Sequence, residues 1–333
     1  MKYMNYRFII SLYGNRQQGM LLPLLFSITK TNPEAGITLF WEEIDENLIA
    51  LMQKCFPKAE FVKTNFNFGD NIAKRISSKT VMWEYAIRKK PDEYLAFIDA
   101  DVLLIRNVAS FFEKIDADII LTVDNENKYP LNTGVILCHS VAPVQSFFSA
   151  WKKETQNIFE IPTLYEMANN KALAYGGTDQ MAIQRLIDFE KEKNSYLYNN
   201  IKISSIPRHQ MNETNSVPIT PDIHIIHYKG GWNGILFQGK NFTPNRPKSE
   251  SWEMYIFYLR NYADSINYLN KKTDSNFLPE DFGLVIPFYL NRNNFKENKW
   301  LYPLYCVYSW IKNLPGRLKR FYDERINSHL SWL

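Results

Sequence analysis

Two aspartates near the middle of the chain have the residue type and spacing of a divalent-cation site. Asp99 and Asp101 directly follow an apolar run, residues 94–98, that predicts a buried strand. Residues two apart in an extended chain point to the same side, so the two carboxylates lie close together. Like charges at the end of a core strand are costly unless a cation lies between them, and Mg²⁺ and Mn²⁺ prefer carboxylate oxygens and bridge to phosphates. Because open α/β sheets bind ligands at the carboxyl ends of their strands, we interpret this stretch as a metal–diphosphate site; a plain acidic turn is the alternative.

The same tripeptide recurs at Asp116-Ala117-Asp118. This copy precedes an apolar run, residues 119–123, instead of following one. The amino end of a parallel strand is the wrong end for ligand binding. We therefore interpret the second copy as a surface turn.

A glycine pair opens a predicted helix, with Thr178 expected as its N-cap. Gly176 and Gly177 would leave backbone N–H groups free at the positive end of that helix. Asp179 and Gln180 lie in its first turn. These two side chains either face a ligand or, in the alternative, Asp179 only stabilises the start of the helix, where aspartate is favoured.

The apolar run 223–228 predicts a strand whose two histidines point to opposite faces. A single histidine in a strand is more often a core or surface residue than a ligand. His227 is the better candidate for a ligand because Lys229 and a glycine pair follow it. Its imidazole could complete a metal shell with two carboxylates, and Lys229 could neutralise a phosphate. Gly134, at the start of another predicted strand, permits close approach of backbone or ligand.

The hydrophobic pattern predicts the scaffold that must position these groups. Strands are expected at residues 8–12, 37–41, 61–62, 94–98, 119–123, 132–138, 201–207 and 223–228. Helices are expected at residues 18–30, 76–87, 108–115, 144–151 and 178–187, after a cap at Asp45, and from Arg246-Pro247 onward. The alternation of strands and helices is typical of a doubly wound, mostly parallel sheet.

Size and composition exclude several classes of protein. A chain of 333 residues can hold one large α/β domain with a tail, or two modest domains. A net charge of +4 is too small to argue for a nucleic-acid partner. The three cysteines are an odd number without metal-ligand spacing, which fits a reducing compartment and argues against a disulfide framework. No apolar run reaches the length of a membrane span, which predicts a cytoplasmic protein or one attached peripherally to a membrane.

The stretch 296–322 interleaves tryptophans and tyrosines with lysines and arginines. Such a segment can lie in a membrane interface, here on the inner face of the plasma membrane. A helical hairpin packed on the domain, with Pro303 and Pro315 as breakers, is an equal alternative.

The order of four motifs resembles glycosyltransferases of the GT-A fold, in particular the family 8 type, typified by bacterial lipopolysaccharide galactosyltransferases and glycogenin. The motifs are apolar-Asp-x-Asp at 94–101, Asn-x-Gly-Val-Ile-Leu at 132–137, Gly-Thr-Asp-Gln at 177–180 and His-Tyr-Lys-Gly at 227–230. Each motif alone is weak, but four in this order are fairly specific. The resemblance covers residues 6–235 and implies a GT-A (Rossmann-like), mostly parallel central sheet flanked by helices. The expected division is a nucleotide-sugar-binding and catalytic domain over residues 1–245 and a helical C-terminal extension over residues 246–333.

The resemblance also implies roles for individual residues. Asp99, Asp101 and His227 would hold Mn²⁺ or Mg²⁺, and Asp179 and Gln180 would be the catalytic pair beside the donor sugar. Asn132 and Gly134 would line the sugar pocket, and Ser11 and Tyr13 would meet the nucleotide base. The other residues implied in donor binding are Arg75, Lys79, Ala100, Gly177, Lys229 and Gly230, together with the two metal-binding aspartates.

The chain departs from the family pattern at two positions. The family usually shows His-x-x-Gly-x-x-Lys-Pro-Trp, whereas here Lys229 comes early and no Lys-Pro precedes Trp232. Met181 stands where a further acidic residue often follows Asp-Gln. These departures change the expected phosphate contacts and the expected sugar pocket.

The expected function is the metal-dependent transfer of a hexose-type sugar from a nucleoside-diphosphate donor, a UDP-sugar, to a bacterial surface glycan or glycolipid such as lipopolysaccharide or capsule. One alternative is a non-catalytic glycan- or nucleotide-binding protein. Another is a sugar nucleotidyltransferase, which would need a glycine-rich basic loop after the first strand. The sequence there, Tyr13-Gly14-Asn15-Arg16-Gln17, has one glycine and disfavours that class.

Overall fold

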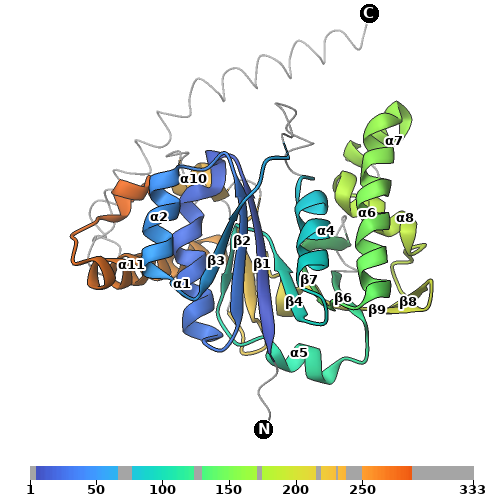
Figure 1. Ribbon diagram of the computed structural model, residues 1–333, viewed down its shortest axis with the longest axis horizontal. Coiled ribbons are helices and arrows are strands. Elements are labelled where there is room, and N and C mark those ends of the chain that lie inside the picture. The colour runs from blue at the N-terminus through green and yellow to red at the C-terminus, as the bar shows by residue number, and fades with distance from the viewer. Residues whose placement is uncertain are drawn as a thin grey trace, which may run out of the picture.

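The protein is built on an eight-stranded sheet with the strand order β3-β2-β1-β4-β7-β6-β9-β8, seen near the centre of Figure 1. The computed structural model describes residues 5–66, 77–123, 130–170, 175–214, 219–229, 232–237 and 250–286. The strands of this sheet are β1 (Tyr6–Tyr13), β2 (Gly36–Glu42), β3 (Ala59–Lys63), β4 (Tyr94–Ile98), β6 (Ile119–Val123), β7 (Leu131–His139), β8 (Ser195–Tyr198) and β9 (Ile201–Pro207). Strands β7 and β8 run opposite to the other six, so the expectation of a mostly parallel sheet is confirmed.

Helices cover both faces of the sheet (Figure 1). One face carries α1 (Leu21–Thr31), α2 (Glu46–Cys55) and α11 (Glu250–Thr273). The other face carries α4 (Lys79–Lys89), α6 (Ala142–Glu160) and α8 (Thr178–Leu186). The shorter helices are η1 (Asn15–Met20), α5 (Ala109–Lys114), α7 (Pro162–Asn169), α9 (Arg208–Met211), α10 (Trp232–Phe237) and η2 (Pro279–Phe282).

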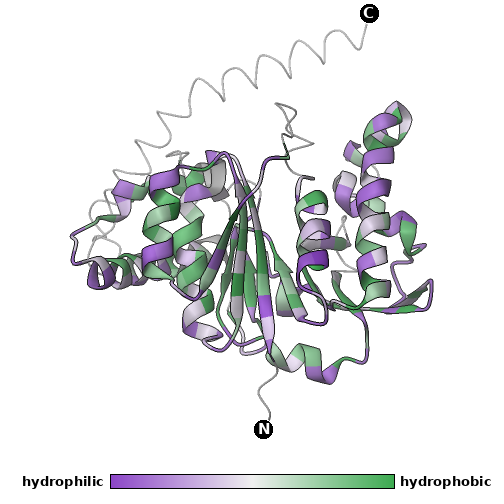
Figure 2. Ribbon diagram, viewed as in Figure 1, coloured by the Kyte–Doolittle hydropathy of each residue, from purple (hydrophilic) through white to green (hydrophobic). Residues whose placement is uncertain are grey.

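Strand β4 shows why the sequences of the central strands are continuous apolar runs. Leu95 and Phe97 pack among α4, α6 and α8, whereas Ala96 and Ile98 pack on the opposite side. All four side chains are fully buried, because helices cover the sheet on both faces. Figure 2 shows the same pattern as hydrophobic strands between helices of mixed character.

Three strands differ from the sequence-based expectation. The predicted strand 223–228 is shortened to β10 (Ile225–His227), and it lies outside the main sheet. It pairs antiparallel with β5 (Val102–Leu104), which was not predicted. Three apolar residues carry no readable periodicity, and the partner of β5 is far away in the sequence, so local patterns could not reveal this pairing. Strand β8 was likewise not predicted.

Helix α11 packs into the same hydrophobic core as α1 and α2, on one face of the sheet. Its buried residues Tyr258 and Leu269 belong to the same cluster as α1, and the Tyr262 hydroxyl donates to the Gly19 carbonyl at 3.0 Å. The division at residues 245/246 falls outside the described residues and stays a prediction. No helix in the described ranges combines the length and apolar character needed to cross a bilayer.

Candidate active site

The two aspartates of the first tripeptide meet His227 just beyond the end of β4. The β5–β10 pairing places His227 directly opposite Val102, the residue after Asp101. His227 Nε2 lies 3.0 Å from Asp101 Oδ1 and 3.8 Å from Asp99 Oδ2. One ligand atom from each of the three residues lies within 4.8 Å of the others, which fits a single metal ion. We call Asp99, Asp101 and His227 the acidic–histidine cluster.

Lys79, the first residue of α4, is buried against this cluster. Its ammonium lies 3.0 and 3.1 Å from the two oxygens of Asp99, and 3.3 Å from Asp179 Oδ2. It also donates to the Thr133 carbonyl at 3.3 Å. The Lys79 ammonium thus joins Asp99, an expected metal ligand, to Asp179, the residue expected beside the donor sugar.

The two aspartates of the cluster have different electrostatic surroundings. Burial raises the pKa of Asp99 and, with the nearby Asp101 charge, outweighs the lowering effect of Lys79 and His227. Burial also acts to raise the pKa of Asp101, but the charge and hydrogen bond of His227 outweigh it, and this pKa is lowered. Burial acts to lower the pKa of Lys79, yet Asp99 and Asp179 raise it overall. The cluster therefore keeps Asp101 as its more strongly ionised carboxylate.

Helix α8 brings Asp179 to the same place. Its carboxylate accepts a 2.6 Å hydrogen bond from Thr133 Oγ1, and its backbone carbonyl accepts one of 2.8 Å from the Trp151 indole. The expectation that Thr178 is the N-cap is wrong. Gly177, at φ 135°, is the N-cap, a backbone conformation that favours glycine, and the Thr178 hydroxyl instead contacts Ser77.

Gln180 has one satisfied and one unsatisfied end. Its amide nitrogen donates to the Gly176 carbonyl at 3.1 Å. Its Oε1 is buried and has no hydrogen-bond partner among the described residues. A buried amide oxygen without a partner is costly, so this atom is available for a hydrogen bond from a ligand.

Strand β7 starts beside the cluster because it runs opposite to β4. The Asp99 amide donates to the Gly134 carbonyl at 2.9 Å. A Cβ built on Gly134 would lie 2.6 Å from His227 Cε1 and 2.9 Å from Asn132 Oδ1. Gly134 therefore leaves the room that the His227 ring occupies, as its position at the start of a strand indicated.

The other expected donor-binding residues have varied positions. Ser11 and Tyr13 lie at the carboxyl end of β1, the strand next to β4. Ala100 is buried between the two aspartates, and half-buried Lys229 follows β10. Arg75 and Gly230 lie outside the described residues.

Several contacting residues were missed by sequence reasoning. Thr133 and Trp151 hold Asp179, and Asn212 Oδ1 lies 2.7 Å from His227 Nδ1. Thr133 lies inside the Asn-x-Gly motif that was singled out, so its position was a usable signal. Trp151 and Asn212 come from elements distant in the sequence, and neither carries a local signal.

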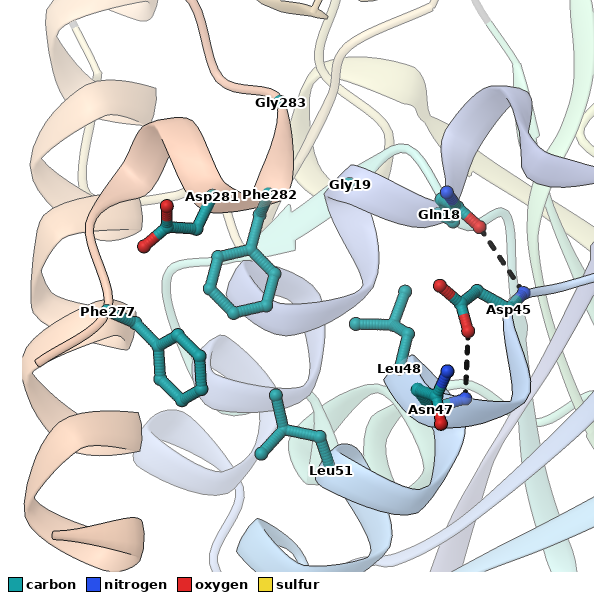
Figure 3. Close-up of a pocket in the computed structure, with 10 residues that line it drawn as sticks. All are labelled: Gln18, Gly19, Asp45, Asn47, Leu48, Leu51, Phe277, Asp281, Phe282 and Gly283. Carbon is teal, nitrogen blue, oxygen red and sulfur yellow. Dashed lines mark hydrogen bonds between the residues drawn. The ribbon is translucent and has the colours of Figure 1, made fainter. Parts of the chain in front are cut away.

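A cavity of about 570 Å³ lies apart from the acidic–histidine cluster, between η1, α2 and η2 (Figure 3). Phe277 and Phe282 face Leu48 and Leu51 across it. Its acidic side chain Asp45 caps α2, as predicted, by accepting from the Asn47 amide at 2.8 Å. The lining contains two aspartates and no basic side chain, which disfavours a phosphate ligand. None of the expected site residues lines it.

The fold and the cluster together define a class of protein: α/β proteins with an acidic candidate metal site at the carboxyl edge of the sheet. Comparisons with known proteins add to this description. Residues 94–231 match the profile of the family described as nucleotide-diphospho-sugar transferase. That segment contains the acidic–histidine cluster and Asp179 with Gln180. Comparison with curated proteins gives no significant match.

Solved structures share the fold at low sequence identity. The glycosyltransferase GlyE of Streptococcus pneumoniae TIGR4 superposes with a TM-score of 0.51 at 15% identity, over 80% of this chain and 63% of that one. This chain thus spans less than two thirds of GlyE. The galactosyltransferase LgtC, solved with donor and acceptor sugar analogues, gives a TM-score of 0.44 at 13% identity over 83% of this chain and 98% of that one. The chain therefore shares a fold with a solved glycosyltransferase, and its segment 94–231 matches the nucleotide-diphospho-sugar transferase profile.

Proposed function

We propose that this protein transfers a hexose-type sugar from a UDP-sugar to a bacterial surface glycan or glycolipid, such as lipopolysaccharide or capsule, in a metal-dependent reaction. The observation that carries the proposal is the acidic–histidine cluster at the carboxyl end of β4, joined through Lys79 to Asp179. The match of residues 94–231 to nucleotide-diphospho-sugar transferases supports the donor class.

The donor set of the cluster fits Mn²⁺ or Mg²⁺. Two carboxylates are the oxygen ligands that both ions prefer, and the imidazole favours Mn²⁺ over the harder Mg²⁺. Such an ion, bound by Asp99, Asp101 and His227, would act as a Lewis acid on the diphosphate oxygens.

The chain's own side chains account for the rest of the proposed mechanism. Lys79 and Lys229 supply fixed positive charge where the leaving diphosphate gains negative charge. The N-terminal end of α8, at Gly177, adds to that potential. Asp179, held by Thr133 and Trp151, orients the sugar hydroxyls, and the unpaired Oε1 of Gln180 accepts a hydrogen bond near the anomeric carbon. In this proposal Asn132 and Gly134 line the sugar pocket, and Ser11 and Tyr13 meet the base.

The test is a panel of nucleotide sugars incubated with the protein and Mn²⁺, with release of the free nucleoside diphosphate as the readout. One donor should be hydrolysed in a Mn²⁺-dependent manner, and addition of EDTA should abolish the reaction. A calorimetric titration with UDP and Mn²⁺ separates the alternatives. Metal-dependent UDP binding without turnover of any donor would favour a non-catalytic binding protein, and no binding at all would refute the donor class.

The proposal extends to the segment 296–322, which lies outside the described residues. We propose that its aromatic and basic side chains contact the inner face of the plasma membrane. Sedimentation with vesicles containing anionic lipid should retain the full chain, and loss of that binding should follow replacement of the lysines and arginines of this segment. Equal sedimentation of both versions would refute it.

A further inference from the structure

A chain of hydrogen bonds lies directly behind the acidic–histidine cluster. Asn212 caps the carboxyl end of α9 and is fully buried. Its Oδ1 lies 2.7 Å from His227 Nδ1. Its Nδ2 lies 2.9 Å from Asn132 Oδ1 and 3.0 Å from Thr122 Oγ1. Asn212 therefore joins β10 to the start of β7 and the end of β6.

A backbone amide fixes the orientation of these side chains. The Gly134 N–H donates to Asn132 Oδ1 at 2.8 Å, and because a backbone N–H only donates, that atom must be the amide oxygen. The Asn212 atom facing the same oxygen must then be its NH₂ group. Thr122 Oγ1 uses its own hydrogen on the Asn132 carbonyl at 3.0 Å, so it accepts the second hydrogen of that NH₂ group. Asn212 is left with its oxygen facing His227.

This orientation determines the tautomer of His227. An amide oxygen only accepts, so the ring nitrogen facing it, Nδ1, must carry a hydrogen. Once a binding cation displaces the Nε2 hydrogen that the ring donates to Asp101, the Nε2 lone pair faces the carboxylate oxygens of Asp101 and Asp99, 3.0 and 3.8 Å away. A lone pair opposite two carboxylates is stabilised by a cation between them.

We propose that Asn212 is a positioning residue that holds His227 in the Nδ1–H tautomer and thereby sets the metal affinity of the acidic–histidine cluster. The inference rests on the metal-dependent function proposed above. Partners of metal-binding histidines that fix the ring in this way typically change metal affinity 10- to 100-fold when they are removed.

The first measurement is calorimetric titration with Mn²⁺ alone. Asn212→Leu should bind Mn²⁺ about 10- to 100-fold more weakly than the wild type. Thr122→Val keeps the shape of the side chain but removes the hydroxyl that accepts from Asn212, and it should weaken binding by less than about tenfold. The control is Asn261→Leu, which removes an amide that donates to the Phe257 carbonyl within α11 and should leave the affinity unchanged.

The second measurement is the ¹⁵N chemical shift of the His227 ring nitrogens in the metal-free protein at pH 9, well above the pKa of free imidazole. The wild type should show Nδ1–H, and Asn212→Leu should lose that preference, which a purely structural role would not require. A wild-type ring without a hydrogen on Nδ1, or the same shifts and Mn²⁺ affinity in both proteins, would overturn the inference. If Asn212→Leu does not fold, Thr122→Val decides by the same two readouts. A wild type that binds no Mn²⁺ refutes the proposed function, while the ring shifts still test Asn212.

Discussion

The chain contains the same tripeptide twice, and the two copies have opposite surroundings. Asp99-Ala100-Asp101 follows β4, and its two aspartates lie half-buried beside His227 and Lys79. Asp116-Ala117-Asp118 precedes β6 in an exposed segment, where the Asp116 side chain is 96% exposed and pairs with Lys202. Asp118 accepts from the Lys202 amide at 2.8 Å, which only anchors the loop to β9.

The difference shows that position in the sheet, and not the tripeptide itself, determines the chemistry. Beyond the end of β4, β10 contributes His227, β7 contributes a close backbone and α4 contributes the buried Lys79. Before the start of β6, the Asp116 side chain faces solvent and pairs with the surface residue Lys202. Burial then makes charge pairs strong at the first copy, whereas water screens them at the second.

The largest contrast is expected from alanine at one aspartate of the first copy. Asp101→Ala removes the more strongly ionised carboxylate of the cluster and should lower donor turnover in Mn²⁺ by about 1,000-fold or more, since a bound metal supplies several kcal/mol of transition-state stabilisation. The backbone bond from the Tyr228 amide to the Asp101 carbonyl, 2.7 Å, remains in the variant, so circular dichroism should show an intact fold. Near-normal turnover would break the comparison.

The two lysines that pair with the copies give a matched stability test. Lys79→Met leaves Asp99 and Asp179 buried without their cation, which should cost about 3 kcal/mol in the free energy of unfolding. Lys202→Met removes an exposed pair and should cost less than about 1 kcal/mol. Urea unfolding of both variants measures the difference. Equal losses in the free energy of unfolding would contradict the contrast between the buried Lys79 and the exposed Lys202.

The room around His227 provides a third test. Gly134→Ala would place a Cβ 2.6 Å from the His227 ring, which should cost about 1–2 kcal/mol of stability and weaken Mn²⁺ binding in a calorimetric titration. Gly36→Ala is the control, because its Cβ would meet the flexible end of Arg7 at 2.9 Å. Unchanged Mn²⁺ affinity in Gly134→Ala would mean that the ring can move without loss of the site.

The smallest effect is expected at the second copy. Asp116→Ala should change the free energy of unfolding by no more than about 0.5 kcal/mol, because exposed ion pairs contribute little. Its donor turnover and Mn²⁺ affinity should equal those of the wild type. A loss of turnover comparable to that of Asp101→Ala would show that the second tripeptide belongs to the site after all.

Much of the scaffold could be predicted from the sequence because its elements carry strong local signals. The apolar runs of β1, β4 and β7 are long enough to identify buried strands, and the Asp45 cap of α2 is confirmed. The N-cap of α8 was assigned to Thr178 because threonine is a favoured cap. Gly177 occupies that position instead, since the chain there needs a positive φ and the Thr178 hydroxyl contacts Ser77.

The candidate site could be predicted only in part from the sequence. The three members of the acidic–histidine cluster could be named from motifs, although the strand that joins them, β5, was not foreseen. Lys79 was expected to approach the donor, but its pairing with both Asp99 and Asp179 depends on how α4 and α8 pack. Asn212 could not be foreseen, because its partners come from three separate strands and a single asparagine has no periodicity to detect.

The packing of α11 has a practical consequence for anyone shortening this chain. Met254, Tyr255, Tyr258, Tyr262 and Leu269 are almost completely buried, and the Tyr268 hydroxyl bonds the Cys55 carbonyl at 3.2 Å. A truncation at residue 245 would strip these aromatic side chains from α1 and leave a wide apolar surface open to water. Such a fragment would aggregate on expression, so a minimal soluble version has to retain residues through Thr273.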